Sequence, residues 1–298
     1  MRIAALAFLL LAPAPAPPAD DPCVPVKPCD APPGGASLPA REPPAEFTAE
    51  ARQLFNLVAC QGSAPAGLDA AVVKAFCDPG EKARRDDRAR AARAAVQAGL
   101  PQAGPETLPS VVVYPLSGGD LAGALAGFPD ARNFTLTTRG PAGDPRPASL
   151  RDPARLRRFL ESAAGSGEPA VALPALLSAL ASGGYEPVGL RYLRVEPGGA
   201  LHYFGPEEFA SLGEAAFASC ELLFVKKGEP GRRRVVRLLS ADLTDAGAAA
   251  TPGPLIHLAA KGNFAALLPS SDAIAADGYG RLQAILKERA PVIVTRAR

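Results

Sequence analysis

The sequence predicts an α/β fold built on a mixed, mainly parallel sheet with flanking helices. The β-branched run 111–114 is typical of a buried strand, and residues 133–138 are expected to form a second strand. A short glycine turn and the Ala/Leu-rich segment 121–126 lie between the two strands. Strand, turn, helix and strand in this order form the unit of Rossmann-like sheets, whose ligands bind at the carboxyl ends of the strands.

Chain length and composition limit how large the folded domain can be and which classes of partner we expect. A chain of 298 residues, 48% of them apolar, is long enough for one large domain or two small ones. Its net charge of +2 argues against a nucleic-acid partner, because neutralising phosphates requires a concentrated basic face. The 29 glycines and 33 prolines predict many loops and at least one disordered segment.

Residues 1–19 have the pattern of a signal peptide. Arg2 supplies a positive charge, an unbroken apolar run follows at residues 3–11, and prolines end that run. The run is much shorter than the ~20 apolar residues that a membrane helix needs. We therefore predict export, to the periplasm or the medium, with no stable membrane span after cleavage. A retained membrane anchor is the alternative.

The stretch between the signal peptide and the first strand divides into two parts. Residues 20–46 are rich in proline and nearly free of large apolar side chains, which predicts a disordered leader. Residues 47–104 are expected to form a helical subdomain, because apolar side chains recur at helical spacing from Phe47 to Val58 and from Leu68 to Phe76. The charged stretch 81–97 is interpreted as a solvated helix face; an anionic partner is the alternative.

The five cysteines are expected to lie in an oxidising compartment, because the chain is predicted to be exported. Cys60 and Cys77 flank one predicted helix, so a disulfide between them would pin a helical hairpin. Cys23 and Cys29 are the second expected pair, which leaves Cys220 buried and free. We predict no metal site, because no two cysteines have Cys-x-x-Cys spacing and neither histidine is near one.

Residues 105–298 are expected to form the Rossmann-like domain. After its opening unit, a helix capped by Asp152 precedes a second helix at 173–181. Strands 188–195 and 201–204 are expected to pair in antiparallel fashion across a glycine turn, and a polar loop is expected after residue 240. The remaining elements alternate as strands at 221–226, 234–240, 263–268 and 291–295 and as helices at 254–260 and 279–288.

The turn after the first strand is the main candidate for binding a ligand. A glycine turn that opens a helix can present backbone N–H groups to a phosphate or carboxylate, and Ser117, Gly118, Gly119 and Asp120 form such a turn. It matches neither the dinucleotide fingerprint nor a P-loop, and no acidic residue ends the second strand. We therefore predict no cofactor. A purely structural turn, with Asp120 capping the helix, is the alternative.

A nucleophilic hydrolase is a further possibility. Ser117, then Asp242 or Asp245, then His257 follow the chain order of the α/β-hydrolase triad. A proline, however, stands where the nucleophile elbow needs its first glycine. Both histidines lie beside apolar residues, a context typical of satisfied structural histidines.

Two motifs resemble those of a family of uncharacterised exported bacterial proteins. Residues 113–120 are similar to its Tyr-Pro-Phe-Ser-Gly-x-Asp motif, and residues 128–131 match the Phe-Pro-Asp-Ala that follows. Residues 240–245 resemble its Phe-Ser-x-Asp-Leu-Ser-Asp segment, with Leu239 in place of the phenylalanine. The family's Leu-Glu-Pro-x-Gly run is not kept at 138–143. No active site can be carried over from this family, and a looser likeness to Rossmann-like methyltransferases concerns the fold alone.

Together these observations predict an exported ligand-binding module of the cell envelope, non-catalytic or degenerate, whose partner is a small ligand or an envelope protein. The alternative is a hydrolase or transferase that uses the turn at 117–120 with the loop at 240–245. Both segments follow predicted strands, and the carboxyl ends of parallel strands meet at one edge of a sheet. The expected ligand-binding residues are Ser117, Gly118, Gly119, Asp120 and Asp242.

Overall fold

The structure is a computed structural model, and all the residues it describes belong to one compact unit within Leu38–Arg298. The predicted signal peptide, the expected cysteine pair of the leader, the candidate turn at 117–120 and Asp152 lie outside the described residues. The described residues are 44–62, 67–98, 110–115, 121–138, 156–157, 160–161, 172–212, 218–268 and 278–295.

The described strands form a single eight-stranded sheet. In chain order they are β1 (Val111–Tyr114), β2 (Asn133–Thr138), β3 (Tyr185–Val195), β4 (Leu201–Tyr203), β5 (Ser219–Lys226), β6 (Glu229–Ser240), β7 (Ala265–Leu268) and β8 (Val292–Thr295). Across the sheet their order is β4-β3-β5-β6-β2-β1-β7-β8. Strands β6, β2, β1, β7 and β8 run parallel to one another, whereas β4, β3, β5 and β6 pair in antiparallel fashion.

The opening strand–helix–strand unit is confirmed. Strand β1 pairs with β2 in parallel, with Val112 beside Phe134, and helix α4 (Leu121–Gly127) connects the two strands. Strand β7 pairs with the other side of β1, so the chain builds the sheet outward in both directions from β1. This is the arrangement of a Rossmann-like α/β sheet, as the sequence predicts. The predicted antiparallel pair is confirmed as β3 and β4.

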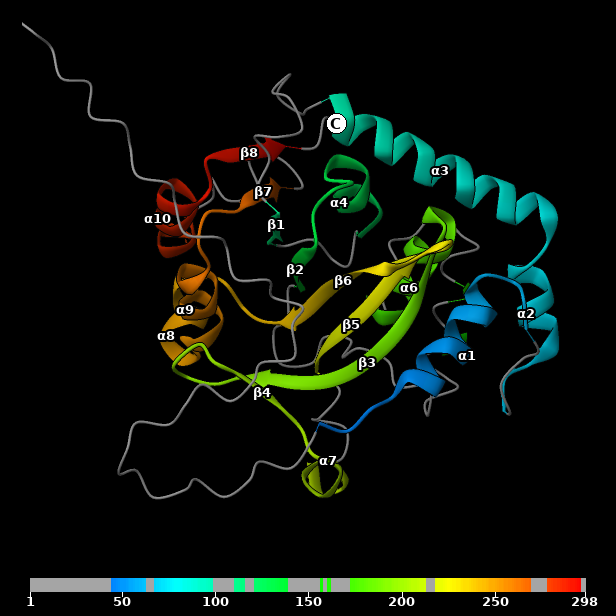
Figure 1. Cartoon of the computed structure of the whole chain (residues 1–298), viewed down its shortest axis with the longest axis horizontal. Helices are drawn as coiled ribbons and strands as arrows, with labels where there is room; N and C mark the ends of the chain where they lie inside the picture. The colour runs from blue at the N-terminus through cyan, green and yellow to red at the C-terminus, as the bar shows by residue number, and fades with distance from the viewer. Residues whose placement is uncertain are drawn as a thin grey trace, which may run out of the picture. The chain divides into compact units, whose positions relative to one another are not determined.

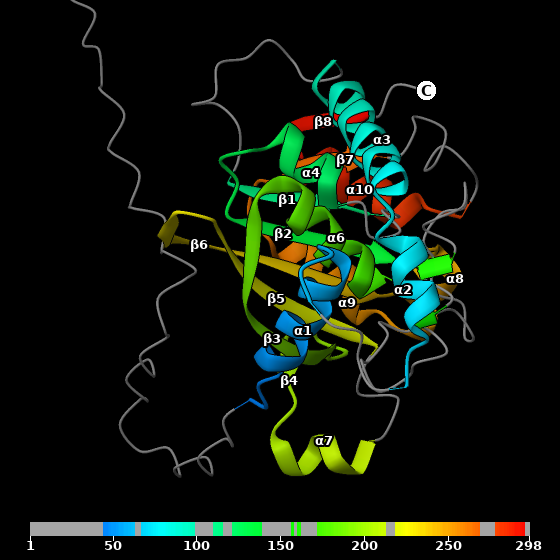
Figure 2. The same ribbon diagram turned by 90° about the vertical axis from the view of Figure 1, so that its right-hand side faces the viewer.

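Helices cover both faces of the sheet. Helices α1 (Thr48–Val58), α4 and α6 (Ala172–Gly183) supply apolar side chains to one core cluster. Helices α8 (Asp245–Ala250), α9 (Gly253–Ala260) and α10 (Gly280–Arg289) supply the other. Figure 1 shows α8, α9 and α10 together at the left, with α1 at the right. In Figure 2 the α1 face is turned toward the viewer, and α9 and α10 lie behind the sheet.

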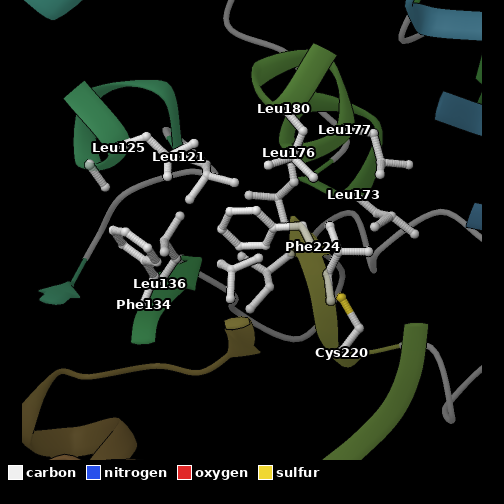
Figure 3. Packing of buried hydrophobic residues seen from close by; sticks show 14 of the residues in the cluster. Leu121, Leu125, Phe134, Leu136, Leu173, Leu176, Leu177, Leu180, Cys220 and Phe224 are labelled. Carbon is white, nitrogen blue, oxygen red and sulfur yellow. The ribbon is translucent and has the colours of Figure 1, made fainter. Parts of the chain in front are cut away.

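The larger core cluster is built from leucine and phenylalanine on the α1 face. Figure 3 shows leucines of α4 and α6 around Phe134 of β2 and Phe224 of β5, whose ring centroids are 6.3 Å apart. Both rings are fully buried, and the sequence alternation along each strand accounts for their sharing a face. The helix leucines labelled there are Leu121, Leu125, Leu173, Leu176, Leu177 and Leu180, and Leu136 of β2 is labelled beside them.

The disulfide predicted across the helical hairpin is confirmed. Cys60 lies two residues after the end of α1, and Cys77 directly follows α2 (Ala70–Phe76). The two cysteines are bonded, with their Cα atoms 5.6 Å apart. Phe47, just before α1, packs edge-on against Tyr192 of β3, with 5.1 Å between ring centroids. The hairpin therefore shares the core of the sheet instead of standing apart from it.

The charged stretch forms α3 (Pro79–Ala98), whose described ion pairs lie within the helix. Lys82 and Asp86 are 2.8 Å apart, and Glu81 pairs with Arg84. These short-range pairs fit the interpretation of α3 as a solvated helix. Nowhere in the described part of the chain is a helix both long enough and apolar enough to cross a bilayer.

Two short helices were missing from the sequence prediction. Helix α7 (Pro206–Leu212) follows β4. The carboxylate of its Glu208 is hydrogen-bonded to His202 Nε2 at 2.6 Å and accepts a hydrogen bond from Arg194 Nη1 at 3.1 Å. Helix α8 replaces part of the polar loop expected after β6. It begins because Thr244 caps it, accepting a hydrogen bond from the Gly247 amide at 3.0 Å. The alanines that follow favour a helix over a loop.

We expect Cys220 to be inert in the folded protein. It is a fully buried free thiol, and burial raises its pKa to about 12, so little of the reactive thiolate forms. Iodoacetamide should therefore leave the Cys220 peptide unmodified in native protein and modify it fully after unfolding in guanidinium. Peptide mapping by mass spectrometry measures this difference, and rapid labelling of native Cys220 would contradict the buried position.

Candidate ligand-binding site

The carboxyl ends of the parallel strands define the first candidate site. Because β1, β2, β6 and β7 run parallel, the segments that follow them leave the same edge of the sheet. The chain connects β1 to β2 on one side of β1, and it later connects β6 to β7 on the other side. Such a reversal opens a crevice in which α/β proteins bind ligands. Ser117, Gly118, Gly119 and Asp120 follow β1 directly but are not among the described residues. Their expected meeting with Asp242 therefore stays a prediction.

Asp242 is placed by the structure at the expected edge, two residues after β6 ends. Its carboxylate accepts a hydrogen bond from the Thr244 amide at 3.0 Å, which forms a turn leading into α8. A Cβ atom on Gly247 would lie only 2.4 Å from the Asp242 carboxyl carbon, so this side chain packs directly on the helix backbone. These contacts indicate that Asp242 fixes the backbone at the start of α8.

Asp245 has an equally defined structural role. It accepts hydrogen bonds from the amides of Gly280 and Arg281, each at 3.0 Å, and so caps the start of α10. These two backbone hydrogen bonds hold the pKa of Asp245 below its usual value. His257, the third residue of the possible triad, bonds instead to the Gly199 carbonyl through Nδ1 at 2.9 Å. The hydrogen bonds seen for Asp242 and Asp245 thus do not include the Asp–His pair that a triad needs.

Asp242 offers a direct test of this structural role. Asp242→Asn keeps an oxygen that accepts from the Thr244 amide, so its free energy of unfolding should stay close to that of wild type. Asp242→Ala removes the acceptor and should cost about 1 kcal/mol. Urea denaturation measures both values. If both variants are as stable as wild type but lose binding of a ligand, Asp242 belongs to the binding site.

A second candidate site, absent from the sequence analysis, is a buried polar network that we call the Arg237 cluster. Arg237 on β6 donates to the Glu221 carboxylate on β5 at 2.8 Å and to the Asn133 side-chain oxygen on β2 at 3.2 Å. Tyr203 on β4 donates to the same Glu221 oxygen at 2.6 Å. The network thereby connects strands from the antiparallel and the parallel parts of the sheet.

The Arg237 cluster lies on the face covered by α8, α9 and α10. In the sheet register Arg237 is beside Thr135, and Thr135 is beside Val113, which belongs to the core cluster of those helices. Only 5% of the Glu221 surface is exposed. Burial disfavours a charged Arg237, but Glu221 and Tyr203 together outweigh burial and raise the pKa of Arg237. Burial and the Glu221 charge also raise the pKa of Tyr203 to about 12.

Two side chains from the end of α9 complete the cluster. Burial and repulsion from Arg237 lower the pKa of Lys261 to about 8. Burial and the Lys261 charge lower the pKa of His257 to about 4, so its ring is neutral at pH 7. A carbonyl only accepts hydrogen bonds, so the His257 nitrogen facing the Gly199 oxygen carries the hydrogen. The other nitrogen, Nε2, is buried without a hydrogen-bond partner, which corrects the interpretation of His257 as satisfied.

The sequence contained one signal for this cluster. Arg237 interrupts an apolar run inside one predicted strand, and Glu221 is the first residue of another. A charge in a buried strand requires a partner. Their pairing depends on the register of β5 against β6, and hydrophobic patterning alone does not reveal that register. Among the described residues, no three His, Cys, Asp or Glu side chains are grouped in a way that could hold a metal ion.

The strand order and the two helical layers define the chain as an α/β protein with a Rossmann-like sheet. No family model matches the chain, and comparisons with curated proteins and with solved structures gave no significant match. The resemblance to exported bacterial proteins therefore rests on the sequence segments 113–120, 128–131 and 240–245 alone.

Proposed function

We propose that this protein is an exported, non-catalytic binding module that holds a small ligand at the carboxyl edge of its parallel strands. The observation that carries this proposal is the strand order β6-β2-β1-β7-β8, in which the chain extends the sheet on both sides of β1. Ligand sites in open α/β sheets are concentrated at such a reversal. The predicted turn at 117–120 comes shortly after β1 in the chain, and its glycine-rich sequence suits an anionic group.

Binding is favoured over catalysis by the contacts of the acidic residues at this edge. The Asp242 carboxylate accepts a hydrogen bond from the Thr244 amide. The Asp245 carboxylate accepts hydrogen bonds from two amides at the start of α10. A general base must be able to reach a proton on the substrate. Carboxylates committed to backbone amides serve that purpose poorly, and they instead fix the shape of the edge.

Export is supported by the amino-terminal sequence and by the disulfide. The charged and then apolar start is the pattern of a signal peptide. The bond between Cys60 and Cys77 is of the kind that persists in the periplasm or outside the cell and is rare in the cytosol. The ligand is accordingly a molecule of the envelope or the medium.

A thermal-shift screen of the purified mature chain against nucleotides, sugars and metals tests the proposal. A ligand should raise the melting temperature of wild type and of Asp130→Asn, a control at the opposite edge just before β2. Asp120→Asn should melt like wild type but show a much smaller shift with ligand. The absence of any hit, or an equal shift in Asp120→Asn, would contradict the proposal. Conversion of the hit to product, followed by mass spectrometry, would favour a hydrolase or transferase.

A further inference from the structure

The charges of the Arg237 cluster are not balanced. Arg237 and Glu221 neutralise each other in their ion pair, whose side chains are 15% and 6% exposed. Lys261 adds a second positive charge close enough to Arg237 for repulsion to affect it. Among the ion pairs of the described residues, none joins Lys261 to a carboxylate. The cluster therefore has one cation in excess.

Thr135 supplies an independent observation. It is fully buried, and its hydroxyl oxygen has no hydrogen-bond partner. The parallel register of β2 and β6 sets Thr135 directly beside Arg237 on the same face of the sheet. Buried hydroxyl groups normally have partners, so an unpaired one next to excess positive charge points to a group that is not part of the chain.

The cluster also has access to solvent. A part of the surface of Arg237, Lys261, Tyr203 and His257 stays exposed, whereas Thr135 and Glu221 are buried. The half-buried side chains come from β6, β4 and the end of α9, and so border the same region from different elements. The two positive side chains are therefore partly open to solvent, and the Thr135 hydroxyl is not.

We propose that Arg237, Lys261 and Thr135 form a binding site for a small oxyanion, such as the phosphate, sulfate or carboxylate group of a metabolite. The oxyanion neutralises the excess charge and accepts hydrogen bonds from the Lys261 ammonium and the Thr135 hydroxyl. Lysine and arginine are the usual partners of such groups in proteins. The site lies under α9 on a face of the sheet and involves none of the residues at 117–120, so it goes beyond the proposed function.

Titration of the mature protein with sulfate, followed by calorimetry, tests this site. Wild type should bind sulfate saturably at pH 7, and Lys261→Met should bind it at least about tenfold more weakly. Thr135→Val has nearly the same shape without the hydroxyl and should weaken binding severalfold. Lys287→Met removes an exposed lysine of α10 and serves as the matched control, with unchanged affinity. Lys261→Met should melt no lower than wild type, because it removes a desolvated charge.

The pH dependence of sulfate binding gives a second readout in wild type. Sulfate keeps its charge between pH 7 and 10, whereas Lys261, with its pKa near 8 in the free protein, loses its proton, so affinity should fall across this range. The groups around Lys261 are Arg237, which stays charged in its pair with Glu221, and Tyr203 and His257, which stay neutral. If Lys261→Met fails to fold, the pH dependence of sulfate affinity in wild type still tests the oxyanion site.

Three results would overturn the oxyanion site. They are the absence of saturable sulfate binding at millimolar concentrations, equal affinity in Lys261→Met and wild type, and a flat pH profile. Asp120→Asn separates this site from the one at the carboxyl edge. If Asp120→Asn abolishes sulfate binding and Lys261→Met leaves it intact, the oxyanion site is wrong and the proposed function stands.

Discussion

Replacing Arg237 by methionine should lower the free energy of unfolding by about 3–5 kcal/mol, because it leaves a buried carboxylate without its counter-charge. Glu221 is only 5% exposed and takes hydrogen bonds from both Arg237 and Tyr203. Without the guanidinium, Glu221 must stay charged in an apolar layer or take up a proton. The Asn133 amide oxygen also loses its donor.

Urea denaturation monitored by circular dichroism measures this loss. Lys226→Met is the matched control, because Lys226 forms an ion pair with Glu229 at 2.9 Å on the same β5–β6 hairpin, but both side chains are largely exposed. Removing an exposed pair costs about 0–1 kcal/mol. The double variant Arg237→Met with Glu221→Gln should recover much of the lost stability. An Arg237→Met variant no less stable than Lys226→Met would show that Glu221 reaches water.

Replacing both Cys60 and Cys77 by serine should lower the free energy of unfolding by about 3 kcal/mol. The bond closes a chain segment across a separation of 17 residues, which restricts the unfolded chain and holds α1 against α2. Comparing denaturation of the variant and of wild type without reductant measures the effect. Reductant should destabilise wild type toward the variant and leave the variant itself nearly unchanged. A variant as stable as oxidised wild type would show that core contacts alone hold the hairpin.

Much of the fold was predictable because its signals are local. Strand β1 is a β-branched run, and β2, α6 and α10 lie close to the ranges expected from apolar spacing. The disulfide was predictable because Cys60 and Cys77 flank one helix of the hairpin. Helix α8 was missed because its alanines follow a polar stretch that is equally typical of a loop.

The site was less predictable because its contacts join residues that are distant in the chain. Asp245 caps α10 from 35 residues away, so the sequence around it gave no sign of that partner. Glu221 and Arg237 meet through the register of β5 against β6, and Lys261 reaches them only because α9 lies on the same face. Sequence patterning indicates which face of a strand is buried, and it does not give the register between strands.

The Arg237 cluster has a consequence for how the protein unfolds. Between β2 and β6 the chain makes a long excursion that contains β3, β4 and β5 before returning to the parallel strands. Tyr203 and Glu221 belong to that excursion, whereas Asn133 and Arg237 belong to the parallel strands on either side of it. If β3, β4 and β5 unfolded alone, Arg237 would lose its Glu221 partner while it stayed inside the sheet. Amide hydrogens of β5 and β2 should therefore exchange with solvent at similar, slow rates, as parts of a single cooperative unit.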